Sequence, residues 1–269
     1  MEMQVTVKRL TGSIGAEVNG VRLGHPLDDA TFAIIHHAFL DHCTLVFRGQ
    51  FLDPEAQIAF ANRWGKAFHT TYLKPLEIPS HPEVMAQANL GKANSYTTEV
   101  WHSDQSFMPA PPAHSILSAQ IIPEAGGDTM FANQYLAYET LSEGMKRLLR
   151  ELRAWHGGAK LATLLGSENS VPPQSHPIVR THPETGRKAL YVNRLYTYCI
   201  EGLTEAESRG LLDFLFEQTC RPEFTYRHQW APGDVIIWDN RCALHYAVHD
   251  YGVVPRLMHR TTIAGDIPS

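Results

Sequence analysis

Residues 224–238 read FTYRHQWAPGDVIIW and show the strand and turn pattern that recurs along the chain. Its two ends, 224–230 and 235–238, have the aromatic and β-branched residues that are typical of short strands. The tripeptide Pro-Gly-Asp at 232–234 lies between them and supplies the pre-bent, flexible backbone that a tight reversal requires. The stretch therefore predicts two short strands separated by a turn.

Similar short strands recur along the chain, with turn sequences such as GGD at 126–128 and PETG at 183–186 between them. Asn19-Gly20 is a strong hairpin signal. Further strands are expected at 4–10, 44–48, 115–122, 129–132, 178–181, 189–192 and 256–264. This series predicts a mainly β fold, a double-sheet barrel or sandwich.

Three helices are expected to flank the sheets. Asp28 precedes an apolar stripe at helical spacing and is the predicted N-cap of the first helix. Asp53-Pro54 gives the second helix an N-cap and a proline at its first position. Thr204 and Glu207 form the capping-box pattern of the third.

Composition points to a small-molecule partner. The net charge is -5 and the sequence has no run of Lys or Arg, so we expect no basic patch that could bind nucleic acid or an anionic membrane surface. No stretch approaches the roughly 20 apolar residues of a membrane helix. A chain of 269 residues with 43% apolar content can form one large core, so a single domain, 1–269, is expected.

The cysteines and the N-terminal segment favour a cytoplasmic protein. The cysteines form no C-x-x-C pair, so reduced and mostly buried thiols are expected instead of disulfides or a zinc site; they are Cys43, Cys199, Cys220 and Cys242. The first residues lack the apolar segment of a secretory signal. Four histidines before prolines or in polar turns are expected at the surface, namely His25, His81, His176 and His182.

The stretch WHSD at 101–104 carries the clearest chemical signal. In an extended segment, residues two apart project to the same side, so His102 and Asp104 can hold one metal ion. One more imidazole completes a two-histidine, one-carboxylate triad, which binds one face of iron(II) and leaves positions for substrates and oxygen. His245 is the candidate.

Two arginines on the predicted strand 256–264 indicate an anion site. Arg256 and Arg260 are four residues apart and share one face of a strand. No acidic run lies near them in sequence, which favours bound anions as partners. One arginine can hold the distal carboxylate of a 2-oxo diacid and the other an anionic substrate; the alternative is two surface arginines on an edge strand.

The whole chain, from about residue 4 to 267, resembles the taurine/2-oxoglutarate dioxygenase family, which includes sulfonate, alkylsulfate and aryloxyalkanoate dioxygenases. The resemblance is carried by four motifs: WHSDQSF at 101–107 with the PAPP turn, GGDTMFAN at 126–133, WDNRCALHYAVHDY at 238–251 and RLMHRTTIAGD at 256–266. It implies a jelly-roll core, the double-stranded β-helix, and a dimer or tetramer.

The resemblance also implies residue roles. His102, Asp104 and His245 would be ligands of Fe(II), while Arg256 and Thr129 would bind the distal carboxylate of 2-oxoglutarate. O2 would be the second co-substrate, with succinate and CO2 as co-products of a hydroxylation. Three positions match residues that bind an anionic substrate in similar enzymes, namely His69, Tyr72 and Arg260.

The substrate pocket departs from the taurine pattern. Thr98 replaces an asparagine, and His156-Gly157-Gly158-Ala159 replaces an aromatic segment. With Val100 and Tyr196 as expected lining, these changes favour a larger apolar anion: an aryloxyalkanoate, an alkyl sulfate ester or a sulfonate longer than taurine.

Two other functions fit parts of the sequence. A hydrolase could hold zinc with the same His/Asp/His set, although it would need neither Arg256 nor Thr129. A catalytically silent barrel could bind a small anion as a sensor or carrier, because fold does not fix function. Dependence on 2-oxoglutarate and oxygen distinguishes the dioxygenase from both.

Overall fold

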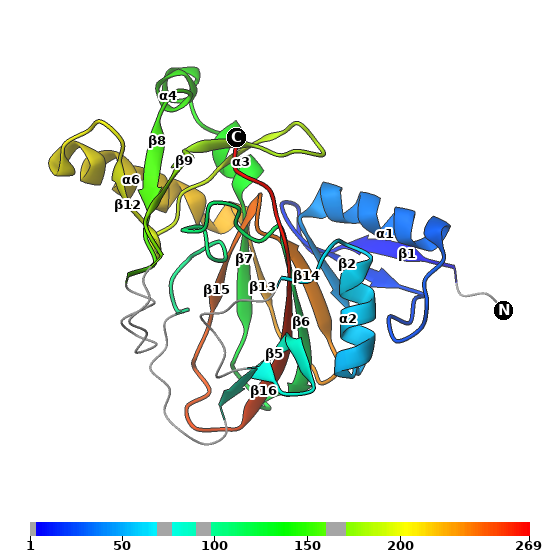
Figure 1. Ribbon diagram of the computed structural model, residues 1–269. Coiled ribbons are helices and arrows are strands. Elements are labelled where there is room, and N and C mark those ends of the chain that lie inside the picture. Colours follow the sequence, from blue (N-terminus) through cyan, green and yellow to red (C-terminus); the bar gives the residue numbers. More distant parts are fainter. Residues whose placement is uncertain (1–3, 69–76, 90–97, 160–170) are drawn as a thin grey trace.

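Two sheets pack against each other across an apolar core in the computed structural model of the protein (Figure 1). The structure describes residues 4–68, 77–89, 98–159 and 171–269. Within these residues, every helix is too short or too polar to cross a membrane. The prediction of a mainly β protein with flanking helices is confirmed.

The larger sheet has eight strands and is antiparallel except for its β2–β3 pair. From one edge to the other its strands are β1 (Thr6–Arg9), β2 (Ala16–Asn19), β3 (Thr44–Phe47), β14 (Val235–Asp239), β6 (His114–Ile121), β16 (Arg256–Ile263), β5 (His81–Asn89) and β4 (Glu77–Ile78). Strand β14 alternates its side chains between the two faces. Ile236 and Trp238 point into the core between the sheets, and Val235 and Ile237 point towards helices on the outer face.

The smaller sheet that closes this core has three antiparallel strands in the order β13 (Thr225–His228), β7 (Thr129–Asn133) and β15 (Ala243–Ala247). Phe131 of β7 and Ala243 of β15 pack in one cluster with Met258 of β16. The two sheets therefore share one core, and β15 brings His245 to its rim.

Helices α1 (Asp29–His42) and α2 (Pro54–Asn62) cover the outer face of the large sheet (Figure 1). Both begin as expected, since the side chains of Asp28 and Asp53 accept hydrogen bonds from backbone N–H groups in the first turn. Phe39 of α1 is fully buried and lies edge-on to Trp64, 4.7 Å between ring centroids. These contacts join α1 to the end of α2, and both helices share one apolar cluster with the sheet.

A third group of elements packs beside the two sheets around its own apolar cluster. Helix α6 (Glu205–Thr219) begins at the predicted capping box of Thr204 and Glu207. The group contains a three-stranded sheet of β12 (Thr197–Ile200), β8 (Arg153–His156) and β9 (Gln174–Pro177), the pair β10 (Val179–Thr181) and β11 (Lys188–Leu190), the helices α3 (Gln134–Glu139), α4 (Glu143–Leu149) and α6 (Glu205–Thr219), and the 3-10 turn η2 (Pro222–Phe224).

Two expectations from the sequence are wrong. The chain does not reverse at Asn19-Gly20: β1 and β2 are joined earlier, where the N–H of Leu10 donates to Gly15, and Gly20 only ends β2 with a φ of 82°. His176 and His182 are buried, because polar partners inside the protein satisfy their ring nitrogens.

The packing of α1 predicts that substitutions on its buried and exposed faces change the free energy of unfolding by different amounts. Phe39→Ala should lower the free energy of unfolding by about 3–5 kcal/mol, because it leaves a cavity beneath Trp64. Ile34→Ala on the exposed face should change it by no more than about 0.5 kcal/mol. Urea denaturation measures both; equal losses would contradict the packing of this helix.

Candidate active site

His102 and His245 lie directly opposite each other in a short antiparallel bridge. The N–H of His102 donates to the carbonyl of His245 at 3.0 Å, and the N–H of His245 donates back at 2.8 Å. Their ring centroids are 4.1 Å apart. Backbone pairing thus brings together two imidazoles that are far apart in the chain.

Asp104 completes the group. Its Oδ1 lies 3.9 Å from Nε2 of His102 and 3.6 Å from Nε2 of His245. All three side chains are buried, and their ligand atoms lie within 4.8 Å of one another. This is the predicted triad, and its three donor atoms converge on one point.

The protonation states suit a metal ion. Burial lowers the pKa of both His102 and His245, so both imidazoles are neutral at pH 7. Burial alone would raise the pKa of Asp104, but Arg260 and the two histidines outweigh it and hold that pKa below its ordinary value. Two neutral imidazoles and one carboxylate are the donor set that non-haem iron(II) takes.

The tautomer of His102 is also fixed. Its Nδ1 lies 2.7 Å from the carbonyl oxygen of Val100, which can only accept, so Nδ1 carries the hydrogen. Nε2 then presents its lone pair towards Asp104, as a metal ligand requires.

Arg256 is a buried cation with spare hydrogen-bonding capacity. Its Nη2 donates to the carbonyl of Gly127 at 3.2 Å, but its Nε–H has no partner among the described residues. Burial lowers the pKa of Arg256, which marks a charge that an anion would stabilise. Gly127, at φ 74°, permits the close approach, since a Cβ there would lie 3.1 Å from Nε.

Thr129 lies on the same face of the small sheet as His245. It pairs with Ala247 across the β7–β15 ladder, two positions along from the pair of Phe131 and His245. Its Oγ accepts a hydrogen bond from the indole N–H of Trp230 at 3.0 Å, which leaves the hydroxyl hydrogen free to donate to an oxygen. Its role towards 2-oxoglutarate stays a prediction.

Arg260 has a partner that its neighbours in sequence do not reveal. It forms an ion pair with Oδ2 of Asp104, a carboxylate far upstream in the chain. The expectation that a bound anion is the partner of each arginine is therefore wrong for the first partner of Arg260, and the alternative of two surface arginines is excluded because both are buried. Its Nε–H is buried without a partner in the described part of the chain, so capacity for one further acceptor remains.

The predicted substrate contacts divide into two groups. Val100 and Tyr196 come together with Phe107 in one apolar cluster, and the ring of Tyr196 lies edge-on to His102 at 6.3 Å. His69 and Tyr72 lie outside the described residues.

A second group of potential ligands, His182, Asp239 and Cys242, is a structural ion-pair site. Nδ1 of His182 accepts the backbone N–H groups of Glu184 and Thr185, so its Nε2 carries the hydrogen and donates to Asp239 at 3.1 Å. Arg241 binds both carboxylate oxygens of Asp239, at 2.9 and 2.7 Å. These contacts occupy the donors that a metal would need.

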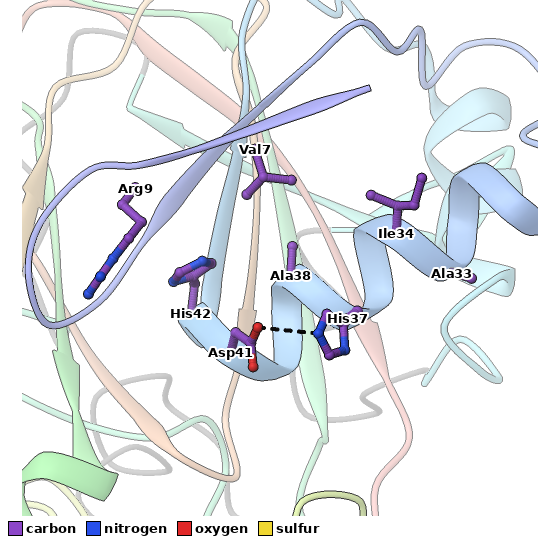
Figure 2. A pocket seen from close by; sticks show the side chains of 8 residues that line it. All are labelled: Val7, Arg9, Ala33, Ile34, His37, Ala38, Asp41 and His42. Atoms are coloured by element: carbon purple, nitrogen blue, oxygen red, sulfur yellow. Dashed lines mark ion pairs between the residues drawn. The ribbon is translucent and has the colours of Figure 1, made fainter. Parts of the chain in front are cut away.

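A hollow of about 650 Å³ lies between β1 and α1. Figure 2 shows the side chains that line it. Val7 and Ile34 face it, and His37 and Asp41 form an ion pair at its side. Strand β1 is the edge strand of the large sheet, and none of the predicted site residues lines this hollow. Its position and lining separate it from the triad.

A family model described as "Taurine catabolism dioxygenase TauD, TfdA family" matches residues 6–262. The chain belongs to this family. The alkylsulfatase of Acinetobacter baylyi is 37% identical over 98% of this chain and 86% of that protein. The (S)-phenoxypropionate/alpha-ketoglutarate-dioxygenase of Sphingobium herbicidovorans is 36% identical over 96% and 94%.

Solved structures agree in fold. A taurine dioxygenase from Burkholderia xenovorans superposes with a TM-score of 0.87 at 37% identity, covering 98% of this chain and 92% of that one. AAD-2 in complex with Mn(II) and N-oxalylglycine gives 0.85 at 31% identity, covering 99% of each. The predicted jelly roll and the predicted class, a dioxygenase that uses Fe(II), 2-oxoglutarate and O2, are confirmed.

The two ligand groups predict different responses to metal. The purified apo-protein should bind one Mn(II) per chain, and Asp104→Ala should abolish that binding because it removes the only anionic ligand of the triad. Cys242→Ala should leave stoichiometry and affinity unchanged. Isothermal titration calorimetry measures both, and a second Mn(II) that Cys242→Ala removes would contradict the ion-pair assignment.

Proposed function

We propose that the protein oxidises a small organic anion with a bulky apolar body, using 2-oxoglutarate as co-substrate. Two observations carry this proposal: the convergence of His102, Asp104 and His245, and the buried Arg256, whose Nε–H has no partner among the described residues. Iron(II) in the triad would supply the oxygen chemistry. The protein's own residues would bind, orient and enclose the reactants.

Arg256 and Thr129 suit the distal carboxylate of the co-substrate. The planar guanidinium matches a carboxylate in two hydrogen bonds, and the spare hydroxyl hydrogen of Thr129 offers a third donor. Neither a zinc hydrolase nor a silent anion-binding barrel requires this combination together with an intact triad. It therefore favours the dioxygenase over both alternatives.

A cavity of about 510 Å³ next to Tyr196 supports an apolar substrate body. It lies where the expected aromatic segment is replaced by glycines: Gly158 packs against the ring of Phe107, and a Cβ there would lie 3.0 Å from that ring. Leu195 and Val171 also line it. Tyr196 lines the cavity and its ring also lies edge-on to His102, so a substrate body in the cavity would lie one side chain away from the metal ligands.

Arg260 supports the anionic part of the proposal. An ion pair with Asp104 holds its guanidinium at the triad. Its Nε–H is buried without a partner among the residues described. A sulfate, sulfonate or carboxylate oxygen would satisfy it. Relatives with such substrates in their names, alkylsulfatase and phenoxypropionate dioxygenase, agree with this class.

Three broader inferences accompany the proposal. We infer that residues 1–269 act as one catalytic domain, because the two sheets that carry the site share a core. The four cysteines are free thiols, which agrees with the expected cytoplasmic location. A dimer or tetramer stays a prediction from the family resemblance.

The function is tested by succinate release from 2-oxoglutarate with Fe(II) and oxygen, across alkyl sulfate esters, aryloxyalkanoates and sulfonates including taurine. We expect at least one of the larger anions to raise succinate well above taurine, and Asp104→Ala to abolish the rise. If no compound in the panel stimulates succinate release by the iron-loaded protein, the proposed substrate class is wrong.

The cavity beside Tyr196 predicts a size effect. Val171→Trp adds an indole to its lining and should raise KM for a long alkyl sulfate or an aryloxyalkanoate by about 10-fold or more. KM for a two-carbon anion should stay within about twofold, which makes the short substrate an internal control. Steady-state kinetics decide, and equal changes for both substrates would exclude the cavity as the site of the apolar body.

A further inference from the structure

The amide of Asn240 has only one possible orientation. The indole N–H of Trp238 donates to its Oδ1 at 3.0 Å, and the backbone N–H of Asp104 donates to the same oxygen at 3.3 Å. Both groups are donors only, so the oxygen must face them. The nitrogen Nδ2 is then directed at Ser115, where it donates to Oγ at 3.1 Å.

That amide determines where the hydroxyl hydrogen of Ser115 points. Oγ accepts one hydrogen bond from Asn240 and another from Nη2 of Arg260, at 3.2 Å. A hydroxyl has two acceptor positions and one hydrogen, and both of these neighbours can only donate. The hydrogen therefore points to Oδ2 of Asp104, 2.7 Å away.

The two oxygens of Asp104 consequently differ. Oδ2 is held by the hydroxyl of Ser115 and by Arg260, while Oδ1 faces the two imidazoles. Ser103, the residue before Asp104, is also bound to Asn240, because its Oγ donates to the carbonyl of Asn240 at 2.8 Å. Asn240 is itself fixed by its N–H, which donates to Ala113 at 2.8 Å.

We propose that Asn240 and Ser115 are positioning residues for Asp104, which make Oδ1 the oxygen that binds the metal and keep Oδ2 away from it. This rests on the proposed metal function of the triad. Both residues are at least 99% buried, in surroundings where a hydrogen bond is strong and a missing one is costly. Neither residue lines the cavity or contacts Arg256, but Ser115 also accepts a hydrogen bond from Arg260. Metal binding in the absence of substrate therefore isolates their effect on ligand geometry.

The test compares two serines of the same strand. Ser115 and Ser118 both lie on β6 and are both fully buried, but Ser118 accepts a hydrogen bond from Gln120, away from the triad. Ser115→Ala, Asn240→Asp and the control Ser118→Ala are made in the full chain. The dissociation constant of each apo-protein for Mn(II) alone is measured by calorimetry, together with its thermal unfolding.

Ser115→Ala and Asn240→Asp should each weaken Mn(II) binding by about 10–100-fold, the usual effect of losing a hydrogen bond to a metal ligand. In Asn240→Asp the new carboxylate cannot donate, so it draws the hydroxyl hydrogen of Ser115 away from Asp104. Ser118→Ala should bind Mn(II) within about twofold of the unaltered protein while it loses a similar amount of stability. The serine pair decides the outcome even if Asn240→Asp does not fold.

Unchanged Mn(II) affinity in folded Ser115→Ala, or equal weakening in Ser118→Ala, would overturn this inference and leave the proposed function intact. An unaltered chain that binds no Mn(II) at all would overturn both.

Discussion

The antiparallel bridge between His102 and His245 is the constraint on which the site depends. Two backbone hydrogen bonds join the loop that contains WHSD to β15, and they set the separation of the imidazoles before any metal binds. Preformed ligands lose little conformational entropy on binding, so such a site can bind metal tightly. The two sheets and their shared core hold the bridge in place.

Charge balance is the second requirement of the site. Asp104 is buried, and its carboxylate stays ionised because Arg260 lies against it. Arg256, four residues earlier on β16, donates from Nη2 to the carbonyl of Gly127, and its Nε–H has no partner among the described residues. One strand thus carries a cation that maintains the metal ligand and a second that is suited to a co-substrate carboxylate.

Local patterns predicted the parts of the fold and site that depend on neighbouring residues. The caps at Asp28, Asp53 and Thr204 are confirmed because each is formed within one helical turn. The spacing of His102 and Asp104 likewise predicts that both side chains face one metal ion, because the two residues lie in one short extended segment. Pairings between distant strands cannot be predicted from neighbouring residues. The ion pair of Arg260 with Asp104 and the hydrogen bonds of Ser115 and Asn240 are therefore visible only in the structure. For Asn240, the sequence offered one signal, its position within the motif WDNR.

The most direct test of the central claim is a crystal structure of the protein grown anaerobically with Mn(II) and N-oxalylglycine, an analogue of 2-oxoglutarate. We expect Mn(II) bound by Nε2 of His102, Oδ1 of Asp104 and Nε2 of His245, with the distal carboxylate of the analogue on Arg256. Mn(II) at the His182, Asp239 and Cys242 group, or that carboxylate on Arg260 instead of Arg256, would contradict it.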